Sequence, residues 1–172
     1  DLEGNWIGAG DFTHNLSEDE NLTHGMRFDS KDNAEVYVGH NHGNDSERFT
    51  LTHVAKDDAT SMSYRGHHEG EKWRADESVD IAADGKVTGQ VSGEYRHALG
   101  KDAELTTGGT LRLDGSWDAN AAVDHRIDDN IGVRHSVRIN SKGESETTHG
   151  VNVIALDGRA AGDAAYSYDQ DG

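Results

Sequence analysis

Hydrophobic and polar residues alternate with a period of two along almost the whole chain, whereas the 3.6-residue period of an amphipathic helix is nearly absent. Successive side chains of a β-strand point to opposite faces of a sheet, so this pattern predicts strands with one apolar and one polar face. Clusters of turn-forming residues interrupt the alternation about every fourteen residues. That spacing leaves no room for helical crossovers, and neighbouring strands must therefore pair antiparallel.

The pattern predicts a single domain over residues 1–172. Asp-Gly, a strong signal for a tight hairpin, occurs in three of the turns, at 84–85, 114–115 and 157–158. The expected fold is all-β: an up-and-down antiparallel meander of about twelve strands closed into one β-barrel. The expected strands are 2–16, 21–29, 34–42, 48–55, 60–68, 72–82, 87–99, 103–113, 116–127, 131–140, 147–156 and 159–169.

Composition excludes several classes of function. The chain has 33 Asp and Glu against 16 Lys and Arg, and its net charge of −17 disfavours binding to nucleic acid or to anionic lipid headgroups. The absence of cysteine excludes disulfides, thiolate catalysis and cysteine-ligated zinc. No stretch approaches the roughly 20 apolar residues of a membrane helix, so the chain could cross a membrane only as a closed barrel.

The alternation separates two faces when each strand is sorted by the parity of its apolar residues. Arginine is not used in the sorting, yet all ten arginines fall on the polar face, together with many carboxylates. Ten of the eleven histidines fall on the apolar face, and only His67 does not. If the polar face surrounds a pore, the residues expected to line it are Asp11, Arg27, Glu35, Arg48, Arg65, Arg74, Asp76, Arg96, Glu104, Arg112, Asp118, Arg126, Arg134, Arg138 and Asp163.

Barrel width favours an outward apolar face. Twelve strands about 4.8 Å apart and tilted by about 40° close at a backbone radius of about 12 Å, which is too wide for side chains to fill. An inward apolar face would leave a void, because many of its residues, such as Gly8, Gly10 and Gly93, are small. An outward apolar face would need lipid, and strands of about ten residues at this tilt form a band about 25 Å tall.

Histidines and aromatic residues gather towards one end of the apolar face when the strands are threaded up and down. Amphipathic rings at one level are typical of a membrane interface. The expected interfacial belt comprises Phe12, His14, His24, His40, Phe49, His68, Trp73, Tyr95, His97 and His125.

The turns at this same end are acidic and are expected to attract small cations. They are expected to hold only Lys72 and Lys101 against ten acids. The acids are Glu18, Asp19, Glu20, Asp45, Glu47, Glu69, Glu71, Asp102, Asp128 and Asp129.

Catalytic and cofactor motifs are absent from the sequence. There is no nucleophile elbow, metal motif or phosphate loop, and we expect no enzyme activity. His40-Asn41-His42 places two imidazoles on one strand face, which could bind zinc, copper or haem iron. A belt or surface role explains these histidines more simply, so no metal site and no cofactor are expected.

On these features the chain resembles the outer-membrane β-barrel and porin group of bacteria, and it resembles even more the idealised barrels made by design. The resemblance covers the whole length as a strand pattern, not as a motif. Long external loops are missing, and aromatic residues make up only 6% of the chain. The resemblance implies an outer-membrane pore, surrounded by lipid or detergent, that passes ions and small solutes by diffusion, with the oligomeric state open.

Two other interpretations remain open. One is a soluble acidic β-barrel, secreted or periplasmic, that holds an apolar ligand, a metal or haem in its interior. The other is a structural acidic β-sheet module. Whether the purified chain stays monodisperse without detergent separates the pore from the soluble container.

Overall fold

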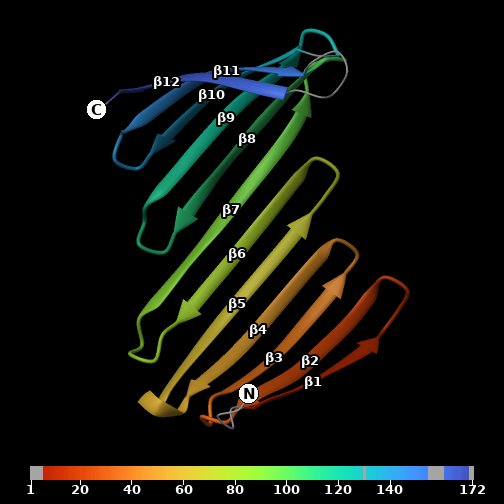
Figure 1. Cartoon of the computed structure of the whole chain (residues 1–172), viewed down its shortest axis with the longest axis vertical. Coiled ribbons are helices and arrows are strands. Elements are labelled where there is room, and N and C mark those ends of the chain that lie inside the picture. Colours follow the sequence, from red (N-terminus) through yellow and green to blue (C-terminus); the bar gives the residue numbers. More distant parts are fainter. Residues whose placement is uncertain (1–5, 130, 155–160, 171–172) are drawn as a thin grey trace. The chain divides into compact units, whose positions relative to one another are not determined.

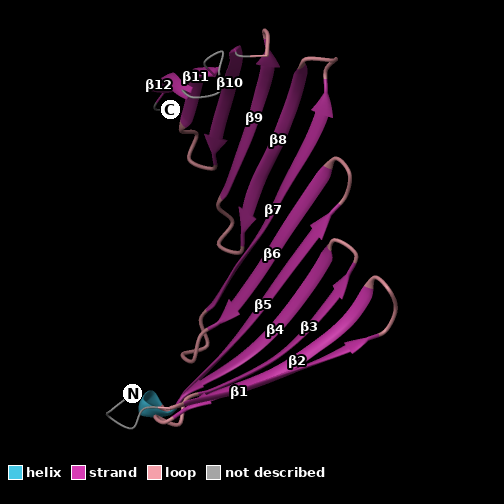
Figure 2. Cartoon of the chain, turned by 45° about the vertical axis from the view of Figure 1, so that its right-hand side comes forward, coloured by secondary structure: helices cyan, strands magenta, loops and turns pink. Residues whose placement is uncertain are grey.

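The computed structural model describes residues 6–129, 131–154 and 161–170, and most of them lie in β-strands (Figure 2). A 3-10 helix of three residues, η1 (Ala55–Asp57), follows the fourth strand. No helix in the described part of the chain is long and apolar enough to cross a membrane. The strands are β1 (Ile7–Asn15), β2 (Glu20–Asp29), β3 (Ala34–His42), β4 (Asp45–Val54), β5 (Ala59–Glu69), β6 (Trp73–Ile81), β7 (Val87–Ala98), β8 (Ala103–Arg112), β9 (Trp117–Arg126), β10 (Ile131–Asn140), β11 (Ser145–Ile154) and β12 (Ala161–Gln170).

The strands form one 12-stranded sheet in which each strand is hydrogen-bonded to its neighbours in the sequence (Figure 1). The registers of β1 to β5 and of β8 to β12 are antiparallel. The prediction of an all-β antiparallel meander of twelve strands is therefore confirmed. The order runs from β1 to β12 and, within the described residues, does not return to β1, so closure into a barrel stays a prediction.

The sheet divides into two compact units. Unit 1 comprises Asp1–Gly70 and Ala75–Val91, and unit 2 comprises Glu71–Arg74 and Ser92–Gly172. Strands β1 to β5 thus lie in unit 1 and strands β8 to β12 in unit 2, while β6 and β7 contribute residues to both.

The described residues of neither unit form a hydrophobic core of the usual kind. Among the described residues Ala122, which is 2% exposed, is the only buried hydrophobic residue. Large apolar side chains stay open, with Phe12 59% and Leu113 63% exposed. A sheet normally buries its apolar face against a second layer, and none of the described residues forms such a layer. Backbone ladders and cross-strand side-chain pairs therefore supply the contacts of the described structure.

Four short turns share one geometry, at residues 29–33, 82–86, 112–116 and 140–144. In the third, the Arg112 amide donates to the Ser116 carbonyl at 2.9 Å, and the Gly115 amide donates to the Arg112 carbonyl at 3.0 Å. Gly115 has a φ of +85°, and this left-handed position closes a type I turn with a G1 bulge. The Asp-Gly hairpin signals at 84–85 and 114–115 are confirmed, and 157–158 lies outside the described residues.

The aspartate of such a turn fixes its own backbone. Asp114 accepts hydrogen bonds from the hydroxyl of Ser116 at 2.7 Å and from its amide at 2.9 Å. The hydrogen bonds from the Ser116 side chain and backbone lower the pKa of the Asp114 carboxyl below its ordinary value of 3.8. The ionised carboxylate therefore stabilises the fold above that value, and this contribution is lost as pH falls through the lowered pKa.

The turn between β3 and β4 corrects one strand boundary. The sequence predicted a strand over 48–55, but β4 begins at Asp45, which pairs directly with His42. Gly43, with a φ of +59°, allows a two-residue connection, so the chain turns back three residues earlier than expected. Asp45 and Glu47, expected in an acidic turn, lie within a strand instead. Glu20 and Glu69 likewise lie in strands, β2 and β5.

We expect Gly115→Ala to lower the free energy of unfolding by about 1 kcal/mol, because the left-handed conformation is unfavourable for L-residues. Gly10→Ala is the matched control: an added Cβ meets nothing within 4 Å at either position, but Gly10 lies in a strand without a positive φ. The control should be neutral or slightly stabilising. Denaturant unfolding of both variants measures the difference, and equal destabilisation would contradict the role of φ.

Candidate functional site: the two faces of the sheet

A tyrosine organises the polar face of unit 1. The registers of β1, β2 and β3 place Asp11, Gly25 and Tyr37 in one row. The Tyr37 ring lies over Gly25, and its hydroxyl donates to Oδ1 of Asp11 at 2.6 Å. The Arg48 guanidinium lies 3.8 Å from the centre of this ring, as in a cation–π contact, and its Nη2 is 3.5 Å from Oε1 of Glu35. Three predicted pore-lining residues thus gather around a tyrosine that the sequence analysis did not select.

Arginines on neighbouring strands of unit 1 turn towards different acids. Arg48 and Arg65 lie directly opposite each other, an arrangement that is unfavourable for like charges. The pairing of Arg65 with Asp80 offsets this repulsion, because Nη2 of Arg65 donates to both carboxylate oxygens of Asp80, at 2.8 and 3.0 Å. Both arginine side chains are half exposed, so these pairs stay hydrated and contribute little stability each.

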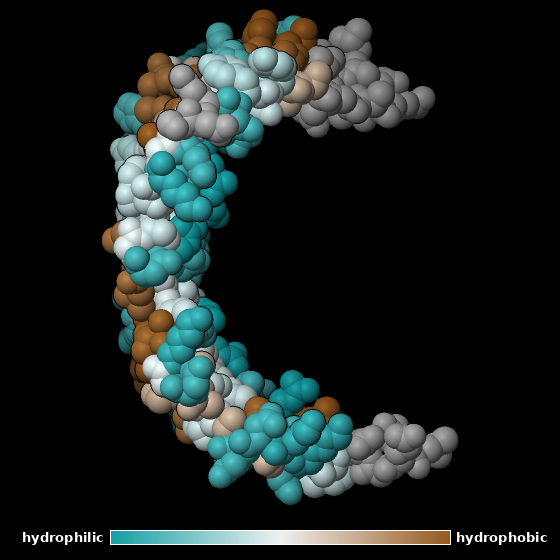
Figure 3. All heavy atoms as spheres, turned by 90° about the vertical axis from the view of Figure 1, so that its left-hand side faces the viewer, coloured by the Kyte–Doolittle hydropathy of each residue, from teal (hydrophilic) through white to brown (hydrophobic). Residues whose placement is uncertain are grey.

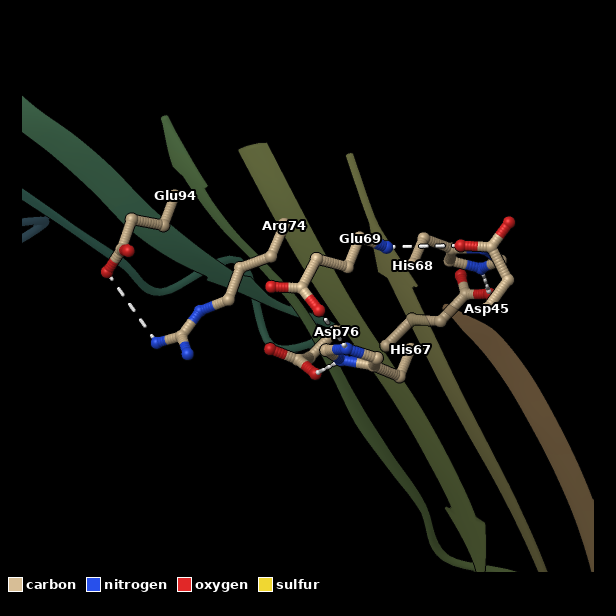
Figure 4. A network of polar contacts seen from close by, with 8 residues as sticks. Asp45, His67, His68, Glu69, Arg74, Asp76 and Glu94 are labelled. Carbon is tan, nitrogen blue, oxygen red and sulfur yellow. Dashed lines mark hydrogen bonds and ion pairs between the residues drawn. The ribbon is translucent and has the colours of Figure 1, made fainter. Parts of the chain in front are cut away.

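His67 lies on the polar face, as predicted, between two carboxylates (Figure 4). Its Nδ1 is 2.6 Å from Oδ1 of Asp76, and its Nε2 is 4.0 Å from Oε2 of Glu69. Ser46 lies opposite His67 on β4. Among the described contacts no hydrogen bond joins Ser46 to His67, so this Ser-His-Asp row does not have the geometry of a catalytic triad.

Asp118 is the centre of the polar face of β8 to β10 in unit 2. Its side chain is 13% exposed and lies between two arginines. Nη2 of Arg112 is 2.8 Å from Oδ2, and Nη2 of Arg138 is 3.5 Å from Oδ1. In a second cluster of unit 2, Glu94 pairs with Arg74 at 3.6 Å (Figure 4). Glu94 also pairs with Arg96 at 2.8 Å. Carboxylates shared between arginines are therefore a recurrent feature of this face.

A hollow of about 780 Å³ opens in unit 2. The register of β8 to β11 places Glu104, Asp124, Arg134 and Gly150 in one row, and Nη1 of Arg134 is 3.4 Å from Oδ2 of Asp124. The row runs from long charged side chains to a glycine, and all four residues line the hollow. The hollow therefore combines charged walls with bare backbone.

The predicted pore-lining residues keep their common face within each unit. Registers and polar contacts place Asp11, Arg27, Glu35, Arg48, Arg65 and Asp76 together in unit 1. In unit 2 the registers place six predicted residues on one face, namely Glu104, Arg112, Asp118, Arg126, Arg134 and Arg138. Arg74 and Arg96 meet at Glu94, and the side chain of Asp163 lies outside the described residues.

The opposite face is apolar, and Figure 3 shows hydrophobic and hydrophilic residues on opposite sides of the sheet. In unit 1, Phe12, His24, Val38 and Phe49 form one row across β1 to β4. The Phe12 and His24 rings stack 5.4 Å apart, and His14 and His24 stack 5.1 Å apart. Three residues of the predicted belt, Phe12, His24 and Phe49, therefore lie in one row across the sheet.

Belt residues of unit 2 also lie in the apolar pattern. Tyr95 and His97 stack with ring centres 6.5 Å apart on β7. His125 lies opposite Val133, and Trp73 is 48% exposed.

Acids interleave with the histidines at one end of the apolar face in unit 1, which the sequence analysis missed. His40 lies opposite Glu47, and His42 lies opposite both Glu20 and Asp45. Nε2 of His40 is 2.9 Å from Oε1 of Glu20. We call this cluster, completed by three residues of β5 and β6, the His/acid belt; it comprises Glu20, His40, His42, Asp45, Glu47, Tyr64, His68 and Glu77.

Glu77 fills a notch at Gly66 within this belt. The Tyr64 hydroxyl donates to Oε1 of Glu77 at 2.8 Å, and Nε2 of His68 is 3.4 Å from the same oxygen. Nδ1 of His68 is 3.8 Å from Oδ1 of Asp45. The sequence did hold a signal for Glu77, because this residue has the same parity as the apolar Val79 and Ile81.

Two further histidines face each other in the apolar pattern of unit 2. His135 and His149 are directly opposed, and their Nδ1 atoms are 2.6 Å apart, so the two rings share a hydrogen bond in which one Nδ1–H donates and the other Nδ1 accepts. Among the described residues no group of three or more His, Cys, Asp or Glu has the arrangement of a metal site.

Comparisons with protein-family models, with curated proteins and with solved structures find no match. No relative therefore supplies a substrate, a partner or a cofactor. The resemblance to porin-like barrels rests on the strand pattern alone.

We expect Gly25→Ala to destabilise the chain by about 1–3 kcal/mol, because the new Cβ would overlap Oδ1 of Asp11 and lie 2.7 Å from the Tyr37 ring. Gly132→Ala is the control on the polar face, where the nearest atom to an added Cβ is 3.9 Å away. Unfolding midpoints and near-ultraviolet circular dichroism of both variants measure the effect. A Gly25→Ala variant as stable as the control would show that the Tyr37 row has no structural role.

Proposed function

We propose that the chain forms a transmembrane β-barrel pore that passes ions and small solutes by diffusion, with the polar face lining the lumen. The observation that supports this proposal most directly is an apolar face left open along a single-layer sheet, opposite a face of hydrated ion pairs. The expected outer-membrane location belongs to the same proposal.

The exposed apolar face argues for lipid as its covering. Monomeric soluble proteins rarely expose contiguous apolar patches larger than a few hundred Å². Val36, Leu51 and Met62 form one exposed row across β3, β4 and β5, being 50%, 39% and 37% exposed. Lipid chains would cover such rows without a second protein layer, and strands of 9 to 12 residues suit a tilted crossing.

A location in a bilayer would also require the sheet to be closed into a barrel. Backbone groups inside a bilayer must be hydrogen-bonded within the protein, so open strand edges are not tolerated there. Pairing β12 with β1 would remove both edges, and with twelve strands in a meander that seam would be antiparallel.

The polar face has the chemistry of a channel wall. Asp118 between Arg112 and Arg138, and Glu94 between Arg74 and Arg96, are charged groups paired across neighbouring strands or along one strand. Such pairs keep fixed charges of both signs next to water. The acidic turns add negative charge at one end, which supports a weak preference for cations.

Disulfide cross-linking tests closure. On β1, Thr13 has the polar-face parity, and on β12 Ala165 and Ser167 share that parity. We expect Thr13→Cys combined with Ala165→Cys or Ser167→Cys to form an intramolecular disulfide in detergent for at least one pair, because a bridge needs Cα atoms within about 7 Å. Thr13→Cys with Ser63→Cys on the distant strand β5 is the negative control. Exclusively intermolecular disulfides would contradict closure and indicate edge-to-edge assembly.

Planar-bilayer recordings test the lumen assignment. Arg134→Glu reverses one charge on the proposed wall, so we expect a shift of the reversal potential towards cation selectivity in a salt gradient. Arg134→Lys keeps the charge and should leave the reversal potential unchanged. Equal reversal potentials for the two variants would contradict the proposal that the polar face lines the lumen. A chain that forms no channels at all, although folded in detergent, would contradict the pore itself.

A further inference from the structure

We propose that His135 and His149 form a two-imidazole site for a divalent transition-metal ion, with Cu²⁺ bound most tightly. The two residues lie on the neighbouring strands β10 and β11 of unit 2, in the apolar pattern of the sheet. Their pairing depends on the register of these strands and not on a pore, so the site goes beyond the proposed function.

The register of β10 and β11 holds the two histidines opposite each other. Nine consecutive residue pairs define this ladder, and His135 with His149 is the fifth, in the middle. Directly opposed side chains of antiparallel strands have Cβ atoms roughly 4.5–5.5 Å apart, a separation across which two imidazoles can reach one ion. The Tyr168 ring stacks on His149, with ring centres 6.4 Å apart, and supports it from β12.

The two rings meet through nitrogens that can bind a metal ion. The Nδ1 atoms are 2.6 Å apart, and the ring planes are inclined by 69°. Imidazole nitrogens bind a metal at about 2.0 Å, so two of them at a right angle lie about 2.8 Å apart and two at a tetrahedral angle about 3.3 Å apart. The observed separation is close to that of adjacent ligands in a square-planar site, the geometry typical of Cu²⁺ and Ni²⁺. Rotation about the Cβ–Cγ bonds, a broad torsion in histidine, can direct both lone pairs at one ion.

The hydrogen bond between the rings determines what an ion replaces. One Nδ1 carries the proton and the other offers a lone pair, whereas a shared metal ion needs a lone pair at both atoms. The donating ring therefore moves its proton from Nδ1 to Nε2 by exchange with water, and both rings keep their charge. Two bonds from Nδ1 to the metal replace one hydrogen bond. Both histidines are exposed, so water or a ligand from solution can fill the remaining positions on the ion.

The surroundings of the pair are uncharged. The registers place six neighbours around it on this face, namely Val123 and Tyr166 in the same row and Val133, Val151, Val137 and Thr147 in the adjoining rows. None of these six is a lysine or arginine that would repel a cation, and none is a carboxylate that would hold an imidazole. The net charge of −17 adds a general attraction of the chain for cations.

Two histidine pairs of unit 1 differ from this pair in geometry. The His14 and His24 rings stack with planes inclined by only 13°, so the lone pairs, which lie in the ring planes, do not converge on one point. His40 and His42 lie on one strand, and Nε2 of His40 is 2.9 Å from Oε1 of Glu20. Parity reveals this second pair in the sequence, whereas the opposed pair in unit 2 requires the register. No metal site was therefore expected from the sequence.

Isothermal titration calorimetry of the full chain in detergent, with Cu²⁺, Ni²⁺ or Zn²⁺ added, tests the site. Excess Mg²⁺ is present because it binds carboxylates in preference to imidazole and so occupies weak acidic sites. We expect one tightly bound Cu²⁺ per chain and weaker binding of Ni²⁺ and Zn²⁺, as the Irving–Williams order requires. His135→Gln and His149→Gln should each weaken Cu²⁺ binding about 100-fold, because the second imidazole of a fixed pair acts at a high effective concentration.

The stacked pair and the same-strand pair supply matched controls. His14→Gln/His24→Gln and His40→Gln/His42→Gln each remove two imidazoles and should keep the affinity of the parent for Cu²⁺. An equal loss of affinity in either control would overturn the inference, because binding would then depend on histidines in general. A parent chain without saturable Cu²⁺ binding would overturn it as well.

Electron paramagnetic resonance of the parent with bound Cu²⁺ does not depend on whether a variant folds. We expect hyperfine coupling to two nitrogen atoms, and coupling to one or to four would contradict the pair as the site. The denaturation midpoint of the parent should also rise with Cu²⁺ concentration, because an ion that binds only the folded chain stabilises it. The same rise in His149→Gln would overturn the inference. Channel recordings decide the pore proposal separately, whichever way these measurements fall.

Discussion

The hydrogen-bonded ladder between neighbouring antiparallel strands is the constraint on which the rest of this structure depends. It aligns residues in rows across the sheet and assigns each row to one face. With no second layer over either face in the described residues, rows rather than a packed core bring together residues that are distant in sequence. Tyr37 meets Asp11, and Tyr64 meets Glu77, only because the registers align them.

Much of this arrangement could be predicted because strand parity and turn chemistry are local properties. The number and order of the strands, most strand ends and the face of each arginine in the described ladders follow from alternation and from Gly, Asp and Asn in turns. The strand predicted over 131–140 has these bounds in the structure. Parity carries this information because a β-strand has a period of two regardless of its partners.

The remaining features depend on register, which parity does not supply. Alternation does not show that the Tyr37 ring covers Gly25, or that Glu77 fits beside Gly66, because both require knowing which residues lie opposite each other. The early start of β4 depends on the left-handed conformation of Gly43. Acids on the apolar face were missed because Asp45 and Glu47 were placed in a turn. Closure depends on β1 and β12, the two strands farthest apart in the sequence.

The repeated turn geometry makes the hairpin the natural building block of this chain. The turns around Gly85, Gly115 and Gly143 have the same conformation, and an added Cβ at any of these glycines would meet nothing within 4 Å. Their hydrogen bonds at the turn are made within five consecutive residues. Two-stranded segments joined by such self-contained turns could be inserted, deleted or reordered without disturbing the turns of their neighbours. The circumference of such a protein can thus evolve, or be engineered, in steps of two strands.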